Sequence, residues 1–264
     1  MKLTTLQKFA TDLAQRAGAI LLQKFGHSQI KVQKGPQDFA TDADLASERL
    51  IVREIKRKFP ESQIIAEESL AVQPPKSEGL VWIVDPLDGT KNFHFGLPVW
   101  GVSLACQKQG QTVLGVIYAP LTRELFVARQ GQGSFCNGHR MRVSAIRELA
   151  RSLVLVELPR TGEQRVFSLA ALGKILPRET RIRVYGAAAL ELAYVARGAA
   201  EGYLDFSHTT KIWDVAAGEL LIREAGGRVQ QVKASLSAPL NVSLLASNGK
   251  VRLCLNRNSS RLEA

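Results

Sequence analysis

The 264-residue sequence has few cysteines and no long apolar run. Cys106, Cys136 and Cys254 lie far apart and are odd in number, which fits a reducing compartment better than a disulfide framework and predicts a cytoplasmic protein. Every apolar run is shorter than the roughly 18 residues that a membrane-spanning helix needs, and polar residues interrupt the N-terminal segment where a signal peptide would need an apolar core. We therefore expect no membrane partner.

The chain is basic, but its charge is not patterned for nucleic acid. It has 35 Lys and Arg against 24 Asp and Glu, a formal net charge of +11. Such a charge draws attention to nucleic acids and anionic substrates. The basic residues are dispersed, however, without a stripe interleaved with aromatic residues. We interpret most of the charge as a solvated cationic surface, and nucleic acid is the less favoured partner.

The first half of the chain, residues 1–147, reads as an α+β unit. Amphipathic spacing predicts two helices and apolar runs predict three strands, followed by an antiparallel meander over 99–143 with a hairpin at Asn137-Gly138. Between the first strand and the second helix, residues 34–37 form a polar loop. The helices span 1–26 and 42–59, and the strands span 30–32, 62–66 and 80–84.

The second half, residues 148–264, alternates strands with helices, which predicts a layered α/β architecture. A break near 147–151 separates the halves, and we expect them to form one compact unit. The predicted strands span 152–158, 181–185, 201–206, 227–232 and 242–247, and the helices span 163–176, 188–198 and 213–227.

Carboxylates directly follow two of the predicted strands. The run SQIIA delivers Glu67, and LVWIV delivers Asp85 and then Asp88. Side chains just beyond a strand lie at the rim of the sheet, where α/β proteins bind ligands. Because Pro86 cannot donate a backbone hydrogen bond, we expect the strand to stop there. The resulting turn can aim Asp85, the Leu87 carbonyl and Asp88 at one point.

Two neighbouring features complete the predicted site. Gly89 allows close backbone approach, and Thr90 can start a helical turn whose free N–H groups favour an anion. Asp214 is predicted at the N-cap of a helix that begins WDVAAG, whose small residues would let it pack closely. Each piece alone also fits an ordinary turn or helix cap, so the indication of a site depends on the acids meeting.

Acids that meet need cations. Their repulsion at about 4 to 6 Å costs on the order of several kcal/mol even at an effective dielectric constant near 20. Oxygen ligands without His or Cys indicate a hard ion, Mg²⁺ or Mn²⁺, rather than Zn²⁺. A phosphoester hydrolase with two metal ions fits this balance of charges.

The same segments resemble the inositol monophosphatase family of Mg²⁺-dependent, lithium-sensitive phosphatases almost from end to end. The resemblance implies an α-β-α-β-α sandwich of the inositol monophosphatase and fructose-1,6-bisphosphatase type, and a homodimer. It is carried by DFATDAD at 38–44, IIAEES at 64–69, WIVDPLDGTKNFHFGLPVWGVSLA at 82–105, GAAALELAYVARG at 186–198 and WDVAAGELLIREAGG at 213–227.

The resemblance assigns ligands to two Mg²⁺ ions, which Mn²⁺ can replace. Glu67, Asp85 and the Leu87 carbonyl would hold the first ion, whose bound water attacks phosphorus. Asp85, Asp88 and Asp214 would hold the second ion, beside the leaving oxygen. A third ion would accompany closure of the family's mobile loop, which corresponds to the segment around residue 34.

Catalytic and substrate roles follow from the same resemblance. Asp44, Glu67 and Thr90 would be catalytic, with Asp44 and Thr90 orienting the attacking water and helping to deprotonate it. The amides of Gly89 and Thr90 would cradle the phosphate. The expected substrate contacts are Gly89, Thr90, Gly186, Ala187, Ala188, Asp205 and Asp214.

The choice of substrate stays open because Asp205 departs from the family spacing. A longer connector separates it from the second signature than separates the family's inositol-contacting glutamate. We favour hydrolysis of a small phosphomonoester, inositol 1-phosphate first. A 3′(2′),5′-bisphosphate nucleotidase or a fructose-1,6-bisphosphatase is the alternative. Some bacterial relatives act in RNA-processing or transcription complexes, so an accessory role there is the second alternative.

Overall fold

The computed structural model describes residues 2–36, 38–69, 78–158, 162–205, 207, 210–232 and 240–253, so Cys254 lies outside the described residues. Within these ranges the strands form a larger sheet of seven strands, a smaller sheet of five and a separate two-stranded ribbon. In the same part of the chain, no helix combines the length and apolar character that crossing a membrane would take.

The larger sheet comes from the first half of the chain. Its strands are β3 (Gln63–Ala66), β4 (Leu80–Asp88), β5 (Gly101–Lys108), β6 (Gln111–Ala119), β7 (Glu124–Arg129), β8 (Gly133–Cys136) and β9 (His139–Arg140), adjacent in that order. β3 runs parallel to β4, and the other neighbours are antiparallel, which confirms the predicted meander. Asn137 (φ 49°) and Gly138 (φ 80°) both adopt the left-handed conformation that the tight turn of the predicted hairpin requires.

The smaller sheet comes from the second half, in the order β11-β10-β12-β14-β13. β10 is parallel to β11 and β12, while β14 is antiparallel to β12 and β13. This confirms the predicted alternation of strands and helices. The elements are a 3₁₀ turn at Leu149–Arg151, β10 (Leu153–Glu157), α4 (Gly162–Ile175), β11 (Arg181–Arg183), α5 (Ala188–Ala196), β12 (Gly202–Asp205), α6 (Ile212–Glu224), β13 (Arg228–Val232) and β14 (Ser243–Ser247).

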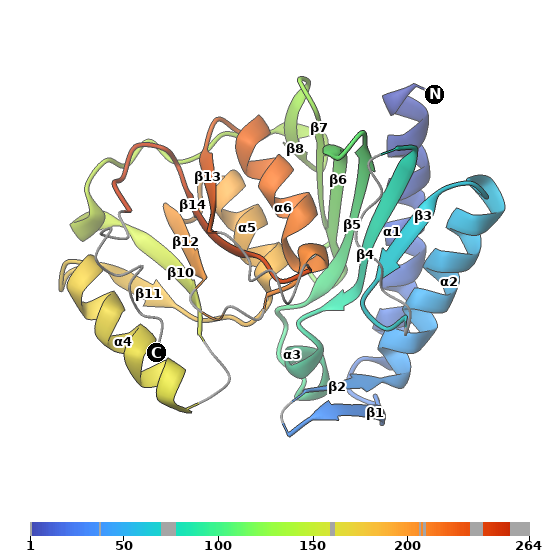
Figure 1. Ribbon diagram of the computed structural model, residues 1–264, viewed down its shortest axis with the longest axis horizontal. Helices are drawn as coiled ribbons and strands as arrows, with labels where there is room; N and C mark the ends of the chain where they lie inside the picture. The colour runs from blue at the N-terminus through green and yellow to red at the C-terminus, as the bar shows by residue number, and fades with distance from the viewer. Residues whose placement is uncertain are drawn as a thin grey trace.

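Sheets and helices stack in five layers (Figure 1). Helices α1 (Leu3–Lys24) and α2 (Asp42–Lys58) cover one face of the larger sheet, α5 and α6 lie between the two sheets, and α4 covers the outer face of the smaller sheet. The buried clusters follow this order, since Leu13 of α1 belongs to the same cluster as Trp82, and Leu172 of α4 to the same cluster as Val154. The predicted α-β-α-β-α sandwich is confirmed.

Helix α6 packs very closely on its neighbours, as its small residues predict. A Cβ atom added to Gly115 of β6 would lie 2.8 Å from the Ala217 carbonyl oxygen. A Cβ added to Gly218 would lie 2.5 Å from the Leu192 side chain of α5. These contacts fix α6 against both the larger sheet and α5, and with it the position of Asp214 in its first turn.

Two local predictions were wrong. β4 does not stop at Pro86, because its pairing with β5 continues to Asp88 after a register shift between Asp85 and Asp88. Lys34 lies in strand β1 (Ile30–Gly35) rather than in a loop, because β1 pairs antiparallel with β2 (Asp38–Thr41) and its polar backbone is satisfied there. A short helix, α3 (Thr90–His94), follows β4 as predicted.

Candidate active site

Most of the residues predicted for the site line one cavity of about 200 Å³. The lining comes from both halves of the chain, so the cavity depends on the packing of the sandwich. The predicted residues that line it are Glu67, Asp85, Leu87, Asp88, Gly89, Thr90, Gly186, Ala188 and Asp214.

The end of β4 aims its carboxylates through local hydrogen bonds. The Leu87 amide donates to Asp85 Oδ1 (2.9 Å), and the Leu190 amide donates to Asp88 Oδ2 (3.3 Å). Both acids are almost inaccessible to solvent, with exposed fractions of 1% and 6%. Ser47 Oγ donates to the Pro86 carbonyl (2.8 Å) and ties this irregular turn to α2. The register shift therefore directs the carboxylates of Asp85 and Asp88, where we had expected an end of the strand at Pro86 to do so.

Gly89 makes the next turn sterically feasible. Its φ is 86°, and a Cβ there would lie 2.8 Å from the Val99 carbonyl oxygen. A residue with a side chain would therefore be both strained and too close to its neighbour. Gly89 and Thr90 both line the cavity.

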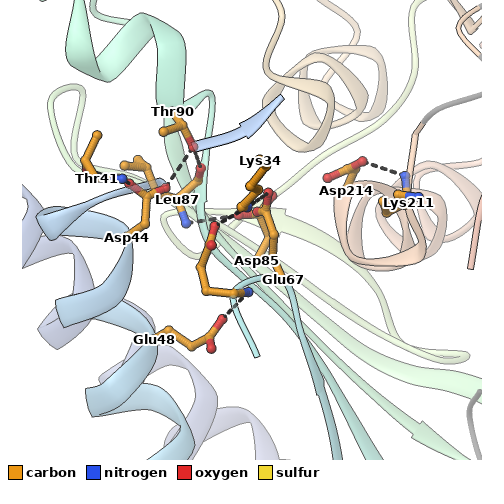
Figure 2. A network of polar contacts seen from close by, with 11 residues as sticks. Lys34, Thr41, Asp44, Glu48, Glu67, Asp85, Leu87, Thr90, Lys211 and Asp214 are labelled. Atoms are coloured by element: carbon orange, nitrogen blue, oxygen red, sulfur yellow. Dashed lines mark hydrogen bonds and ion pairs between the residues drawn. The ribbon is translucent and has the colours of Figure 1, made fainter. Parts of the chain in front are cut away.

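Half-buried Thr90 and buried Asp44 form a hydrogen-bonded pair (Figure 2). Thr90 Oγ1 lies 2.8 Å from Asp44 Oδ1 and 3.0 Å from the Leu87 carbonyl oxygen. The other Asp44 oxygen accepts hydrogen bonds from Thr41 N (2.8 Å) and Thr41 Oγ1 (2.5 Å). Burial raises the pKa of Asp44, although these donors oppose the shift. Asp44 itself lies behind Thr90 and is not among the described residues that line the cavity.

Lys34 lies against two acids at the other side of the site. Its Nζ is 3.3 Å from Glu67 Oε1 and 2.7 Å from Glu68 Oε1 (Figure 2). Glu48 holds this segment by accepting hydrogen bonds from the Glu68 amide (2.8 Å) and from Ser69 Oγ (2.7 Å). Burial acts to lower the pKa of Lys34, but the two carboxylates raise it above its ordinary value.

Asp214 reaches the cavity from α6, but not as the N-cap. Lys211 is the N-cap, and its amide donates to Asp214 Oδ2 (2.6 Å) from three residues upstream. The predicted N-cap role was therefore wrong by three positions, since Asp214 is the third residue of the helix. The reason is that the helix already begins at Ile212, so Asp214 satisfies the free amide from inside the first turn.

The electrostatics of the acids fit a hard divalent cation. Burial, together with repulsion from neighbouring carboxylates, raises the pKa of Glu67 to about 8 and that of Asp88 to about 7. The pKa of Asp85 is raised for the same reasons. Within the described residues, no three acidic, His or Cys side chains stand close enough together to hold a metal ion as they lie. The all-oxygen donor set and the raised pKa values make such a cation stabilising.

Two predicted substrate contacts lie elsewhere. Asp205 is buried at the end of β12 and accepts a hydrogen bond from the Ser207 amide (2.7 Å); it is not among the described residues that line the cavity. Ala187 is likewise buried outside the lining, at the N-cap of α5. Both remain predictions.

Sequence reasoning missed part of the cavity wall. Glu157 could have been found, because it ends the apolar strand run LVLVE in the way that Glu67 follows SQIIA. Arg165 and Thr210 carry no such signal, since packing of the halves brings them to the wall. The missed residues are Asp38, Phe39, Lys91, Glu157, Leu158, Arg165, Val184 and Thr210.

Comparison with known proteins agrees with this geometry. Residues 2–262 match the model of the inositol monophosphatase family. The chain belongs to the inositol monophosphatase family. An inositol-1-monophosphatase of Mesorhizobium japonicum is 37% identical over 97% of this chain and 96% of its own. The Nus factor SuhB of Escherichia coli K12 is 36% identical over 92% of this chain and 91% of its own.

The fold of the family is also seen in solved structures. The extragenic suppressor protein SuhB of Bartonella henselae superposes with a TM-score of 0.81 at 35% identity, covering 93% of this chain and 95% of its own. The fold that the family resemblance implied is therefore confirmed over nearly the whole chain.

Proposed function

We propose that this inositol monophosphatase family member hydrolyses a small phosphomonoester with Mg²⁺, and that inositol 1-phosphate is the first substrate to test. The observation that carries the proposal is that Glu67, Asp85, Asp88 and Asp214, from three separate segments of the chain, all line one cavity. The relative named inositol-1-monophosphatase supports the choice of substrate.

The proposed ligands of two Mg²⁺ ions are Glu67, Asp85, the Leu87 carbonyl, Asp88 and Asp214. When bound, the ions supply positive charge to the phosphate and make water easier to deprotonate. These residues would be held ionised, so the raised pKa values described above would fall on binding.

Thr90 and Asp44 would move the proton of the attacking water. Because Thr90 Oγ1 donates to Asp44 Oδ1 (2.8 Å), its lone pairs are available to accept from water in the cavity. The water proton would pass to Thr90 Oγ1 as the Thr90 proton passes to Asp44 Oδ1. The two hydrogen bonds from Thr41 hold the Asp44 carboxylate in this orientation. The Gly89 and Thr90 amides would bind the phosphate oxygens.

Phosphate release by the purified protein tests the proposal. We expect release from inositol 1-phosphate with Mg²⁺ or Mn²⁺ and loss of release with a chelator, and lithium should inhibit. Fructose 1,6-bisphosphate and 3′-phosphoadenosine 5′-phosphate, measured beside it, decide the alternative, because a higher kcat/KM for either bisphosphate would reverse our order of substrates. No metal-dependent release from any of the three would contradict the proposal.

A second function is favoured by the name of the relatives. The proteins called Nus factor SuhB are as similar to this chain as the phosphatase is, and the chain carries a net charge of +11. We propose as the alternative an accessory role in an RNA or transcription complex. RNA binding that weakens steeply with salt would support it, and no binding at moderate ionic strength would remove it.

The expected homodimer and cytoplasmic location remain predictions. Light scattering after size-exclusion chromatography would measure the oligomeric state, and fractionation of cells would measure the location.

A further inference from the structure

The Tyr185 turn, meaning Tyr185 and Gly186, brings Gly186 to the cavity wall. Gly186 adopts a φ of 66° and lines the cavity, as does Ala188, the first residue of α5. The Leu190 amide of the same helix donates to Asp88 Oδ2 (3.3 Å). The position of this turn therefore sets the distance between the proposed substrate contacts and a proposed metal ligand.

Glu191 holds the turn from inside the protein. It lies in the first turn of α5, and its side chain folds back so that Oε1 accepts a hydrogen bond from the Tyr185 amide (2.8 Å). The nearby Gly186 amide also acts to lower the pKa of this carboxyl. Glu191 is completely buried and is not among the described residues that line the cavity, so any effect on substrate must pass through the turn.

Asn92 holds the same turn from the other half of the chain. Its Nδ2 donates to the Tyr185 carbonyl (2.7 Å) and to the Val99 carbonyl (2.8 Å). The peptide groups of Tyr185 are thus fixed on both sides, by Glu191 at the N–H and by Asn92 at the C=O.

A buried acid at position 191 is costly unless it does something that an apolar residue cannot. Glu191 Oε2 has no hydrogen-bond partner among the described residues, and burial raises the pKa of the carboxyl well above its ordinary value. A leucine would fill similar volume without that penalty. What leucine lacks is the acceptor for the Tyr185 amide.

We propose that Glu191 is a positioning residue which, with Asn92, fixes the Tyr185 turn so that Gly186 and Ala188 meet the substrate at the correct distance from Asp88. The inference rests on the proposed phosphatase function, and it assigns to that site a residue that lies outside the cavity.

Three variants at two positions test this. Glu191→Leu removes the acceptor. We expect KM for the phosphomonoester to rise about 10- to 100-fold while kcat changes less, because a displacement of the substrate contacts by about 1 Å can have an effect of that magnitude. Glu191→Gln keeps an acceptor oxygen, and its KM should stay within about threefold of wild type. Asn92→Ala should raise KM in the same direction, and less than additively when combined with Glu191→Leu.

A matched control is Glu219→Leu. Glu219 is a half-buried glutamate in a helix, and its carboxylate accepts a hydrogen bond from Gln231 Nε2 (2.6 Å), but it is not among the described residues that line the cavity. Its KM should be unchanged. Amide hydrogen exchange adds a readout without turnover: the Tyr185 amide should exchange faster in Glu191→Leu and remain protected in Glu191→Gln.

The two proposals fail separately. If wild type releases no phosphate, the proposed function fails, and the exchange rates alone decide the role of Glu191. If Glu191→Leu keeps wild-type KM and wild-type exchange, the positioning role is overturned. If that variant does not fold, Asn92→Ala decides, and unchanged KM and exchange there would overturn the proposal.

Discussion

The two walls of the cavity are built in different ways. The signature wall, Asp85 to Thr90, is one continuous stretch of chain, and the Leu87 amide donates to Asp85 within it. The far wall, made of Glu157, Arg165, Val184 and Thr210, comes from separate elements of the second half. The signature wall carries two of the acids proposed to bind metal, and the far wall is proposed to surround the rest of a substrate. Variants in the two walls should therefore differ in kind.

Asp88→Asn should give the largest effect. It removes a proposed metal charge without changing shape, and because such charge stabilises the transition state by several kcal/mol, we expect kcat/KM to fall on the order of a thousandfold. Phosphate release over a range of Mg²⁺ concentrations measures it. Asp12→Asn, at a side chain that is 64% exposed on α1, is the control and should behave as wild type. Near-normal turnover of Asp88→Asn would show that the signature wall does not hold the metal.

Gly89→Ala should lower kcat/KM about 100-fold, because the new Cβ would lie 2.8 Å from the Val99 carbonyl and displace the Thr90 amide. Gly96→Ala is a close match, since Gly96 also has a positive φ (75°) but no described atom lies within 4 Å of an added Cβ. It should lose about 1–2 kcal/mol of unfolding free energy from backbone strain and keep its activity. Equal losses of activity in the two variants would mean that strain, and not the shape of the wall, matters at Gly89.

The same contrast explains what could be predicted from the sequence. The acids after SQIIA and LVWIV could be found because the end of a strand and a turn at proline are encoded by adjacent residues. The small residues of α6 likewise predicted its close packing. The continuation of β4 through Pro86 could not, because pairing of Asp88 with Gly101 is a tertiary contact. Arg165 could not be found either, since nothing near it in sequence indicates that the start of α4 reaches the cavity.

Stability without divalent cations should depend on pH through the buried acids of the cavity wall. The folded-state pKa values of Glu67, about 8, and Asp88, about 7, lie above their ordinary values of 4.5 and 3.8, so the native state holds more protons than the unfolded state over this range. The free energy of unfolding should therefore be greatest below about pH 4 and fall as pH rises towards 8. Urea denaturation at several pH values measures this.

Mg²⁺ should reverse that decline, because it favours the ionised acids. Asp88→Asn should reduce the decline in the metal-free protein by on the order of 2 kcal/mol. Burial also raises the pKa of Glu219, away from the cavity, so Glu219→Gln should reduce the decline equally with and without Mg²⁺. A pH dependence that Mg²⁺ leaves unchanged would separate the raised pKa values from metal binding.

The far wall should give the smallest and most selective effect. Arg165 is the cation that this wall adds to the cavity, and its side chain is exposed, so it can meet a second anionic group of a substrate without costly desolvation. Arg165→Gln should raise KM about 3- to 10-fold for a bisphosphate, leave KM for inositol 1-phosphate nearly unchanged and spare kcat for both. Arg178→Gln, at an exposed arginine outside the described lining, is the control. A loss of kcat for both substrates in Arg165→Gln would place Arg165 in the chemistry instead, and the division between the two walls would have to be abandoned.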